Sequence, residues 1–274
     1  MLSNRNKTVR GACKDGLKEQ RIAALRKVVE RLGVSRRGSA PEDESGPLRS
    51  RQGLLQLEGG LPAPGLVCGA LNEVLAAAHS DNPAAFGFMF AATAAALGRR
   101  AGPAVFVASR RALAAFGVPY GHGLAQLGLD PGRLLLVETK TDKDALWALE
   151  ETLRSDARPA MVAGALAGGL DFTSSRRLNL AAGAHLTPLL LLRAAKAAGT
   201  NAAATRWRIA ATLAACDRFG AFAQTRWTVR LERCRKGHTG EWHIEWNHVA
   251  HRFSVVESVA DRASAAGARL RRAG

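Results

Sequence analysis

Residues 75–88 read LAAAHSDNPAAFGF. The apolar run GLVCGALNEV lies before this stretch at 65–74, and the small-residue run GFMFAATAAAL continues from it at 87–97. A strand, a short loop and a helix in this order are the usual setting of a phosphate-binding loop, where backbone amides at the helix N-terminus hold the anion. The pattern G-x-x-x-x-G-K-[ST] is absent. The stretch therefore predicts the shape of a nucleotide site without its lysine.

The segments that follow alternate between apolar runs and helical patterns. Strands that are apolar throughout, separated by helices, are typical of a mostly parallel sheet covered on both faces. The sequence thus predicts an α/β fold. We expect strands at 104–108, 133–138, 159–166 and 187–193, and helices at 142–155 and 172–185.

The segment TRWTVRLERCRKGHTGEWHIEW at 225–246 changes to a period of two. Apolar and polar residues alternate on both sides of the turn KGHTG, which predicts a C-terminal antiparallel hairpin. Its apolar face would bury three tryptophans against the body. Its other face sets Arg226 and Arg230 beside Glu241 and Glu245, which can pair across the strands.

The N-terminal part carries a separate amphipathic pattern at 18–33, with one apolar stripe along a predicted helix. The stripe residues are Ile22, Leu25, Val29 and Leu32. Residues 35–53, SRRGSAPEDESGPLRSRQG, have the composition of a flexible linker. Such a helix either folds back on its own domain or docks on a partner, and we favour the partner. The predicted organisation is a basic helical segment at 1–34, a linker at 35–53, a core at 54–250 and a basic tail at 251–274.

Composition limits the classes of protein that the chain can belong to. Its 274 residues are 47% hydrophobic, enough for a sizeable core, and they contain no apolar run long enough for a membrane span. No secretory signal opens the sequence, and the four cysteines form no C-x-x-C pair. We expect a reduced, cytoplasmic protein without a bound metal.

The net charge of +16 is distributed unevenly. Residues 1–37 carry 11 basic and 3 acidic side chains, and residues 205–236 carry 8 and 2. This pattern is compatible with a polyanionic partner and equally with solubility charge. Candidate nucleic-acid contacts are Arg206, Arg208, Arg226, Arg230, Arg233, Arg235 and Lys236, with Arg269, Arg271 and Arg272 in the tail.

Residues 103–166 resemble the core of a RecA-type ATPase, from AVFVASRRAL through LGLDPGRLLLV to AMVAGAL. The chain as a whole resembles the ImuA family, the RecA-like accessory proteins of bacterial damage-induced, SOS-type mutagenesis. The similarity spans about residues 54–247. Its phrases are GALNEV, DALWALEE, LDFTSSRRLNLAA, TRWRIA and RWTVRLERCRKGHTGEWHIEW.

The resemblance shows which catalytic groups this chain lacks. No lysine occurs between Lys27 and Lys140. The position of the water-activating glutamate of RecA-type ATPases matches Arg110, and that of the Mg²⁺-linked aspartate matches Gly164. The degenerate loop comprises Ser80, Asp81, Asn82, Pro83, Ala84 and Ala85. We therefore expect no enzyme activity, no nucleotide cofactor and no metal.

The resemblance implies a role in translesion DNA synthesis as an adaptor. The implied partners are an ImuB-type polymerase-like protein, an error-prone replicative-type DNA polymerase and RecA, with the stripe at residues 22–32 as the docking element. The alternatives are a DNA-binding module of low sequence specificity and a weak ATPase. The latter would build its phosphate site from Arg99, Arg100 or Arg110.

Overall fold

The structure is a computed structural model, and it describes residues 65–196, 199–216, 222–235 and 239–256, together with the isolated residues Ala23 and Lys27. The two isolated residues are helical and exposed. The predicted stripe at 22–32, the linker at 35–53 and most of the tail lie outside the described residues. In the described part, no helix has the length and apolar character needed to cross a membrane.

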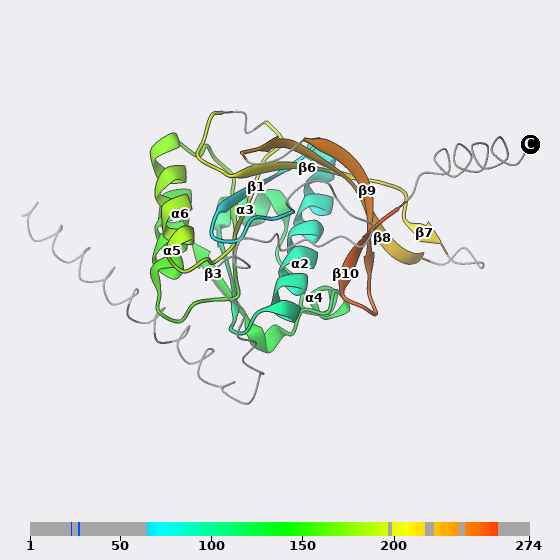
Figure 1. The fold of residues 1–274 in the computed structure, drawn as a ribbon, viewed down its shortest axis with the longest axis horizontal. Helices are drawn as coiled ribbons and strands as arrows, with labels where there is room; N and C mark the ends of the chain where they lie inside the picture. The colour runs from blue at the N-terminus through cyan, green and yellow to red at the C-terminus, as the bar shows by residue number, and fades with distance from the viewer. Residues whose placement is uncertain are drawn as a thin grey trace, which may run out of the picture.

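Seventeen helices and strands make up the described part of the chain (Figure 1). The strands are β1 (Leu71–Ala76), β2 (Ala104–Ser109), β3 (Leu134–Thr139), β4 (Met161–Leu166), β5 (Leu189–Arg193), β6 (Thr205–Ala211), β7 (Ala215–Cys216), β8 (Phe222–Cys234), β9 (Gly240–Asn247) and β10 (Arg252–Val255). The helices are α2 (Asn82–Arg99), α3 (Arg110–Phe116), α4 (Gly121–Gln126), α5 (Asp142–Arg154) and α6 (Phe172–Ala184), with 3-10 turns η2 (His79–Asp81) and η3 (Pro131–Arg133).

The strands form one mixed sheet in the order β10-β9-β8-β6-β1-β5-β4-β2-β3, with β7 paired to β8. All neighbouring pairs from β6 to β3 are parallel, while β8, β9 and β10 continue the sheet in antiparallel fashion. The predicted α/β class, with a mostly parallel core and a C-terminal antiparallel hairpin, is confirmed.

Two apolar layers lie on opposite faces of the sheet. Buried residues of α2, α3 and α4 pack with one face, whereas α5 and α6 cover the other over the parallel strands (Figure 1). The α2 layer extends across the antiparallel strands, where Trp227 and Trp246 are buried against Phe88 and Phe253. Trp242 is only partly buried beside the core. The tryptophan face of the hairpin thus packs largely as the alternation predicts.

In the structure, the strand and the helix on either side of the loop in residues 75–88 begin at other residues than the sequence predicts. The strand begins at Leu71 because Gly69, with a φ of +66°, turns the chain before it. The helix begins at Asn82 rather than near 87, because Pro83 fits the first turn of a helix, where a missing N–H leaves no bond unmade. The intervening loop is therefore only Ala77–Asp81, including the 3-10 turn.

The structure contains three strands that the sequence analysis did not predict, β6, β10 and the two-residue β7. The segment TRWRIAA, treated there as a source of basic side chains, forms β6 and joins the hairpin to the parallel core. β10, at Arg252–Val255, lies within the range assigned to the basic tail. The hairpin is consequently an extension of the central sheet and not a separate layer.

Candidate functional site

The loop between β1 and α2 hydrogen-bonds to its own chain where a phosphate-binding loop would present its amides to a ligand. The Ala77 N–H donates to the Ile209 carbonyl at 2.8 Å. The Asp81 carboxylate accepts the Ala78 N–H at 3.0 Å and the Ala211 N–H at 3.0 Å. One anionic side chain thus takes two backbone donors and ties the loop to the end of β6.

The first turn of α2 offers few further donors. Pro83 has no N–H. The Asn82 side-chain amide donates to the Ala115 carbonyl at 3.2 Å, and the Ala84 carbonyl accepts the Trp227 indole N–H at 2.9 Å. Of the remaining residues in the degenerate loop, Ser80 is exposed and Ala85 is buried. The geometry is therefore that of a closed turn that starts a helix.

The two positions that match catalytic carboxylates of RecA-type ATPases do not face this loop. Arg110 forms an exposed ion pair with Glu138 on the edge strand β3, with Nε and Oε1 2.6 Å apart. A Cβ placed on Gly164 would lie 3.0 Å from Leu149 and 3.2 Å from Leu191 in the apolar layer under α5. An acid at position 164 would therefore be buried among leucines.

Asp142 is a carboxylate at the same edge of the sheet, and it has a structural role. It accepts the Ser109 hydroxyl and the Gly168 N–H, the latter at 2.6 Å. These bonds connect the end of β2, the start of α5 and the loop after β4. Among the described residues, no group of three His, Cys, Asp or Glu side chains could hold a metal ion.

A buried ionic cluster lies on the α6 face of β1, β5 and β6, and Glu73 is its centre. Glu73 is fully buried and accepts bonds from Arg193, Asn201 and Arg206, the last two at 2.9 and 2.6 Å. Burial raises the pKa of Glu73, but these three donors outweigh it and hold the pKa below its ordinary value. The carboxylate is ionised, and it fixes the β5–β6 connection onto β1.

Several of the arginines considered for nucleic acid have partners within the chain. Arg206 binds Glu73, as described. Arg208 pairs with Glu232, and Arg226 pairs with Glu245 across β8 and β9.

Arg233 donates to the Asn201 side chain at 2.7 Å and to the Ala203 carbonyl at 3.0 Å. Burial and the nearby charge of Arg206 lower the pKa of the Arg233 guanidinium. Four of the seven candidates thus stabilise the sheet.

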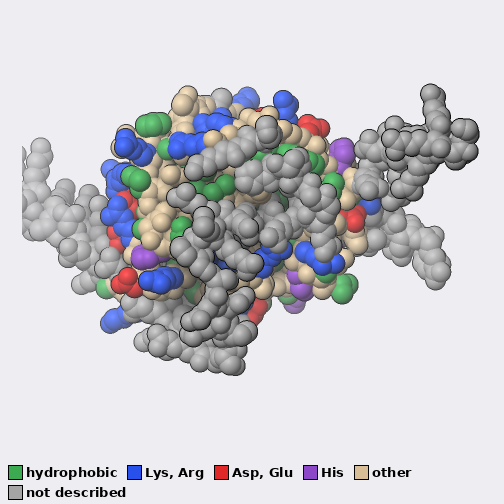
Figure 2. All heavy atoms as spheres, viewed as in Figure 1, with side chains coloured by type: hydrophobic (Ala, Val, Ile, Leu, Met, Phe, Trp, Pro, Cys, Tyr) green, Lys and Arg blue, Asp and Glu red, His purple; other side chains and the backbone are tan. Residues whose placement is uncertain are grey.

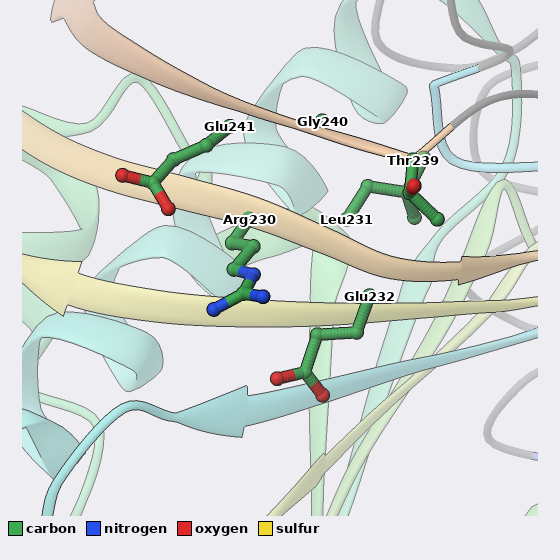
Figure 3. Close-up of a pocket in the computed structure, with 6 residues that line it drawn as sticks. All are labelled: Arg230, Leu231, Glu232, Thr239, Gly240 and Glu241. Carbon is green, nitrogen blue, oxygen red and sulfur yellow. The ribbon is translucent and has the colours of Figure 1, made fainter.

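Arg230 and Arg235 differ from those four. Both are exposed, and no ion pair with another described residue holds either side chain. Arg230 points into an open hollow of about 590 Å³, between the carboxylates of Glu232 and Glu241 (Figure 3). Lys236, Arg269, Arg271 and Arg272 lie outside the described residues. On the face shown in Figure 2, Lys and Arg side chains are spread over the described surface without forming a single patch.

Comparison with known proteins decides the family. The chain is 32% identical over 241 residues to Protein ImuA of Caulobacter vibrioides, in both strain NA1000 and strain CB 15. The match covers 80% of this chain and 93% of the relative. The chain belongs to the ImuA family. No protein-family model matches it.

This member of the ImuA family has two structural residues that sequence reasoning missed. Glu73 occurs in the phrase GALNEV, which served only as a mark of resemblance, although an acid within an apolar strand is itself a signal of a buried partner. Asp81 appears in the sequence analysis only as a member of the degenerate loop. Its place as acceptor of the Ala211 N–H depends on β6, a strand that the sequence reading did not contain.

Proposed function

We propose that this ImuA-family protein is a non-catalytic RecA-like accessory protein of SOS-induced translesion DNA synthesis, which acts through contacts with other proteins. The observation that carries the proposal is the closed loop after β1, where the Asp81 carboxylate takes the N–H groups of Ala78 and Ala211. Family membership supports the cellular process, since the resemblance to ImuA implies a role in damage-induced mutagenesis.

The electrostatics of the loop argue against phosphoryl transfer. Catalysis of that reaction depends on cations and amides that stabilise charge on the transferred group. Here the Asp81 carboxylate already accepts the Ala78 N–H. A bound nucleotide would place its negatively charged phosphates beside that carboxylate, which would repel them. Two of the arginines that a weak ATPase would use are engaged: Arg110 by Glu138, and Arg100 by the Leu186 carbonyl at 3.2 Å.

Titration calorimetry of the full chain with Mg·ATP tests the absence of nucleotide binding. We expect no binding heat at millimolar nucleotide. Saturable heat that disappears in Arg110→Ala would contradict the proposal and support the ATPase alternative. Glu138→Gln is the control, because it frees Arg110 while keeping the guanidinium in place.

The partners that we propose are an ImuB-type polymerase-like protein, an error-prone replicative-type DNA polymerase and RecA. The docking element is the apolar stripe of the N-terminal segment. We expect the double variant Leu25→Asp, Val29→Asp to lose capture of the ImuB-type partner in a pulldown with purified proteins, because charged side chains cannot enter an apolar interface.

Ala23→Asp is the matched control for that pulldown, because Ala23 is exposed and helical in the same segment. It should retain capture. If the stripe variant captures the partner as well as the unmodified chain does, the stripe is not the docking element.

A second candidate function is DNA binding of low sequence specificity, favoured by the exposed Arg230 and Arg235. Arginine contacts to phosphates give affinities of about 1–100 µM that fall steeply with salt. In an electrophoretic titration, Arg230→Glu, Arg235→Glu should abolish the shift seen at low salt. The double variant Arg111→Glu, Arg158→Glu is the control, since both residues are exposed and lie in α3 and after α5, outside the hairpin. Absence of any shift with the unmodified chain would eliminate this function.

A further inference from the structure

The outer face of α6 exposes two large apolar side chains that share one stripe. Phe172 and Leu180 are 51% and 64% exposed. They stand eight residues apart with Arg176 midway, at the i, i+4, i+8 spacing that places side chains along one side of a helix. The opposite side of α6, including Leu178, is buried in the layer against the sheet. Phe172 and Leu180 therefore form an apolar stripe on the side of α6 that faces away from the sheet.

The other large exposed apolar side chains do not form such a surface. Val118, Tyr120, Leu213 and Val249 lie in turns or connections, and Leu136 lies on the edge strand β3. Within the described residues, α6 is thus the helix whose exposed face combines regular geometry with large apolar side chains. A face of this kind fits another amphipathic helix, whose ridges pack between its side chains.

The N-terminal part of the chain enters the body beside this helix. Gly69 lies against Leu186 and the Ala182 carbonyl, at the C-terminal end of α6. The Leu71 N–H donates to the Asn179 side chain of α6 at 3.1 Å. The continuously described part of the chain begins at residue 65, four residues before the first of these contacts. Everything N-terminal to it is therefore tethered near α6.

We infer that the predicted helix at 18–33 docks through its apolar stripe on the outer face of α6 in the same chain. At a rise of about 1.5 Å per residue, the stripe from Ile22 to Leu32 spans about 15 Å, and Phe172 to Leu180 spans about 12 Å. The two stripes match in length. Both carry large apolar side chains at helical spacing, and Arg176 stands between the two on α6.

The short connection between the segment at 18–33 and the core favours that segment as the occupant of the α6 face. About 30 residues separate Gly33 from residue 65, and a flexible chain of that length spans roughly 30 Å on average. The 13 residues of α6 extend over only about 20 Å, so every part of the helix is within reach. A tether of this length corresponds to a local concentration of about 1 mM, well above that of a free second copy in dilute solution.

In this arrangement α6 and a partner protein compete for the same apolar stripe of the N-terminal segment. A partner that binds Leu25 and Val29 must first displace them from α6, so its apparent affinity is lowered by the fraction of chains in which the segment is docked. The tests below use the chain alone, so they hold or fail independently of the proposed partners.

Disulfide trapping tests the contact. In a full-length variant with Cys13→Ser, Leu25→Cys and Leu180→Cys, we expect oxidation to yield a monomer of increased mobility on a non-reducing gel. The matched variant carries Val249→Cys in place of Leu180→Cys, since Val249 is 91% exposed in the turn before β10, which contacts α4 on the other side of the sheet. It should not form the cross-link. No intramolecular product with Leu180→Cys, equal products with both, or a cross-linked dimer would overturn the inference.

Release of the segment gives a second readout. Leu180→Asp leaves the buried side of α6 unchanged, so we expect the fold to persist while amide exchange at 18–33 becomes about tenfold faster or more. Leu213→Asp, at a position 90% exposed and away from α6, should leave the exchange of that segment as in the unmodified chain. Unchanged exchange in Leu180→Asp would show that α6 does not hold the segment.

Discussion

At the level of single residues, Glu73 shows how a charge can be accommodated inside an apolar sheet. A buried carboxylate is costly unless it is paired and its remaining lone pairs accept hydrogen bonds. Arg193 and Arg206 supply the charges, and Asn201 adds a neutral donor. The cluster therefore holds the β5–β6 connection in one arrangement, and each member depends on the others.

Glu73→Gln should destabilise the protein by about 3–5 kcal/mol, because removal of one partner leaves buried arginines without their counter-charge. Urea unfolding at pH 7 measures the effect. Glu138→Gln is the control, since it removes an exposed ion pair with Arg110 and should cost at most about 1 kcal/mol. Equal losses in the two variants would contradict the role assigned to burial.

The same carboxylate predicts a pH dependence. The pKa of Glu73 is lower in the folded chain than in the unfolded one. Its contribution to stability is therefore complete above the unfolded-state pKa and is lost as the pH falls through the folded-state pKa. The unfolding free energy of Glu73→Gln should decline less steeply than that of the unmodified chain below about pH 4.5. Parallel curves would assign the acid sensitivity to other carboxylates.

Gly164 allows a test of whether the missing metal carboxylate can simply be restored. Gly164→Asp should cost about 3 kcal/mol or more, because the new side chain would meet Leu149 and Leu191 away from water. Gly98→Asp, at a site with open space, should change stability by less than about 1 kcal/mol. Thermal unfolding compares the two. A stable Gly164→Asp variant that binds Mg²⁺ would show that the position faces a site.

At the level of elements, the β8–β9 hairpin and α2 are held together by aromatic side chains. Trp227 lies 6.0 Å from Phe88 and 5.9 Å from Phe253 between ring centroids, and its indole N–H reaches the Ala84 carbonyl. The hairpin therefore packs on the same helix that starts at the degenerate loop. This contact connects the first turn of α2 to the hairpin.

Trp227→Ala should lower the unfolding free energy by about 3–5 kcal/mol, the usual loss when a buried aromatic side chain leaves a cavity. Trp242→Ala, on the next strand but only partly buried, should cost distinctly less. Denaturant titration followed by far-UV circular dichroism distinguishes them. A larger loss at Trp242 than at Trp227 would contradict the difference in burial between these two side chains.

At the level of the whole molecule, β6 joins the parallel and antiparallel strands into one sheet, with a shared apolar layer formed by α2. A continuous sheet and core predict cooperative unfolding. Tryptophan fluorescence reports largely on β6, β8 and β9, which carry four of the five tryptophans. Amide exchange in β2 and β4 reports on the parallel strands, and both probes should give the same midpoint in urea. Two separate midpoints would mean that the C-terminal strands form an independent unit.

Much of this architecture follows from local patterns in the chain. The continuous apolar runs that form β2, β4 and β5 predict buried parallel strands, and the alternation around KGHTG predicts the hairpin. β6 has the same alternation, with Trp207 and Ile209 buried on one face and Arg206 and Arg208 on the other. It was not predicted because its arginines suggested a binding surface, and only its neighbours in the sheet supply the carboxylates that pair with them.

The amino-acid order alone establishes that the phosphate loop lacks its lysine, because residue identity does not depend on the fold. What takes the place of a ligand in that loop depends on contacts between distant segments. Asp81 and Ala211 are 130 residues apart in the sequence. They meet only because β6 lies beside β1 in the sheet. Partners so far apart in sequence leave no local pattern, since strand order and not spacing brings them together.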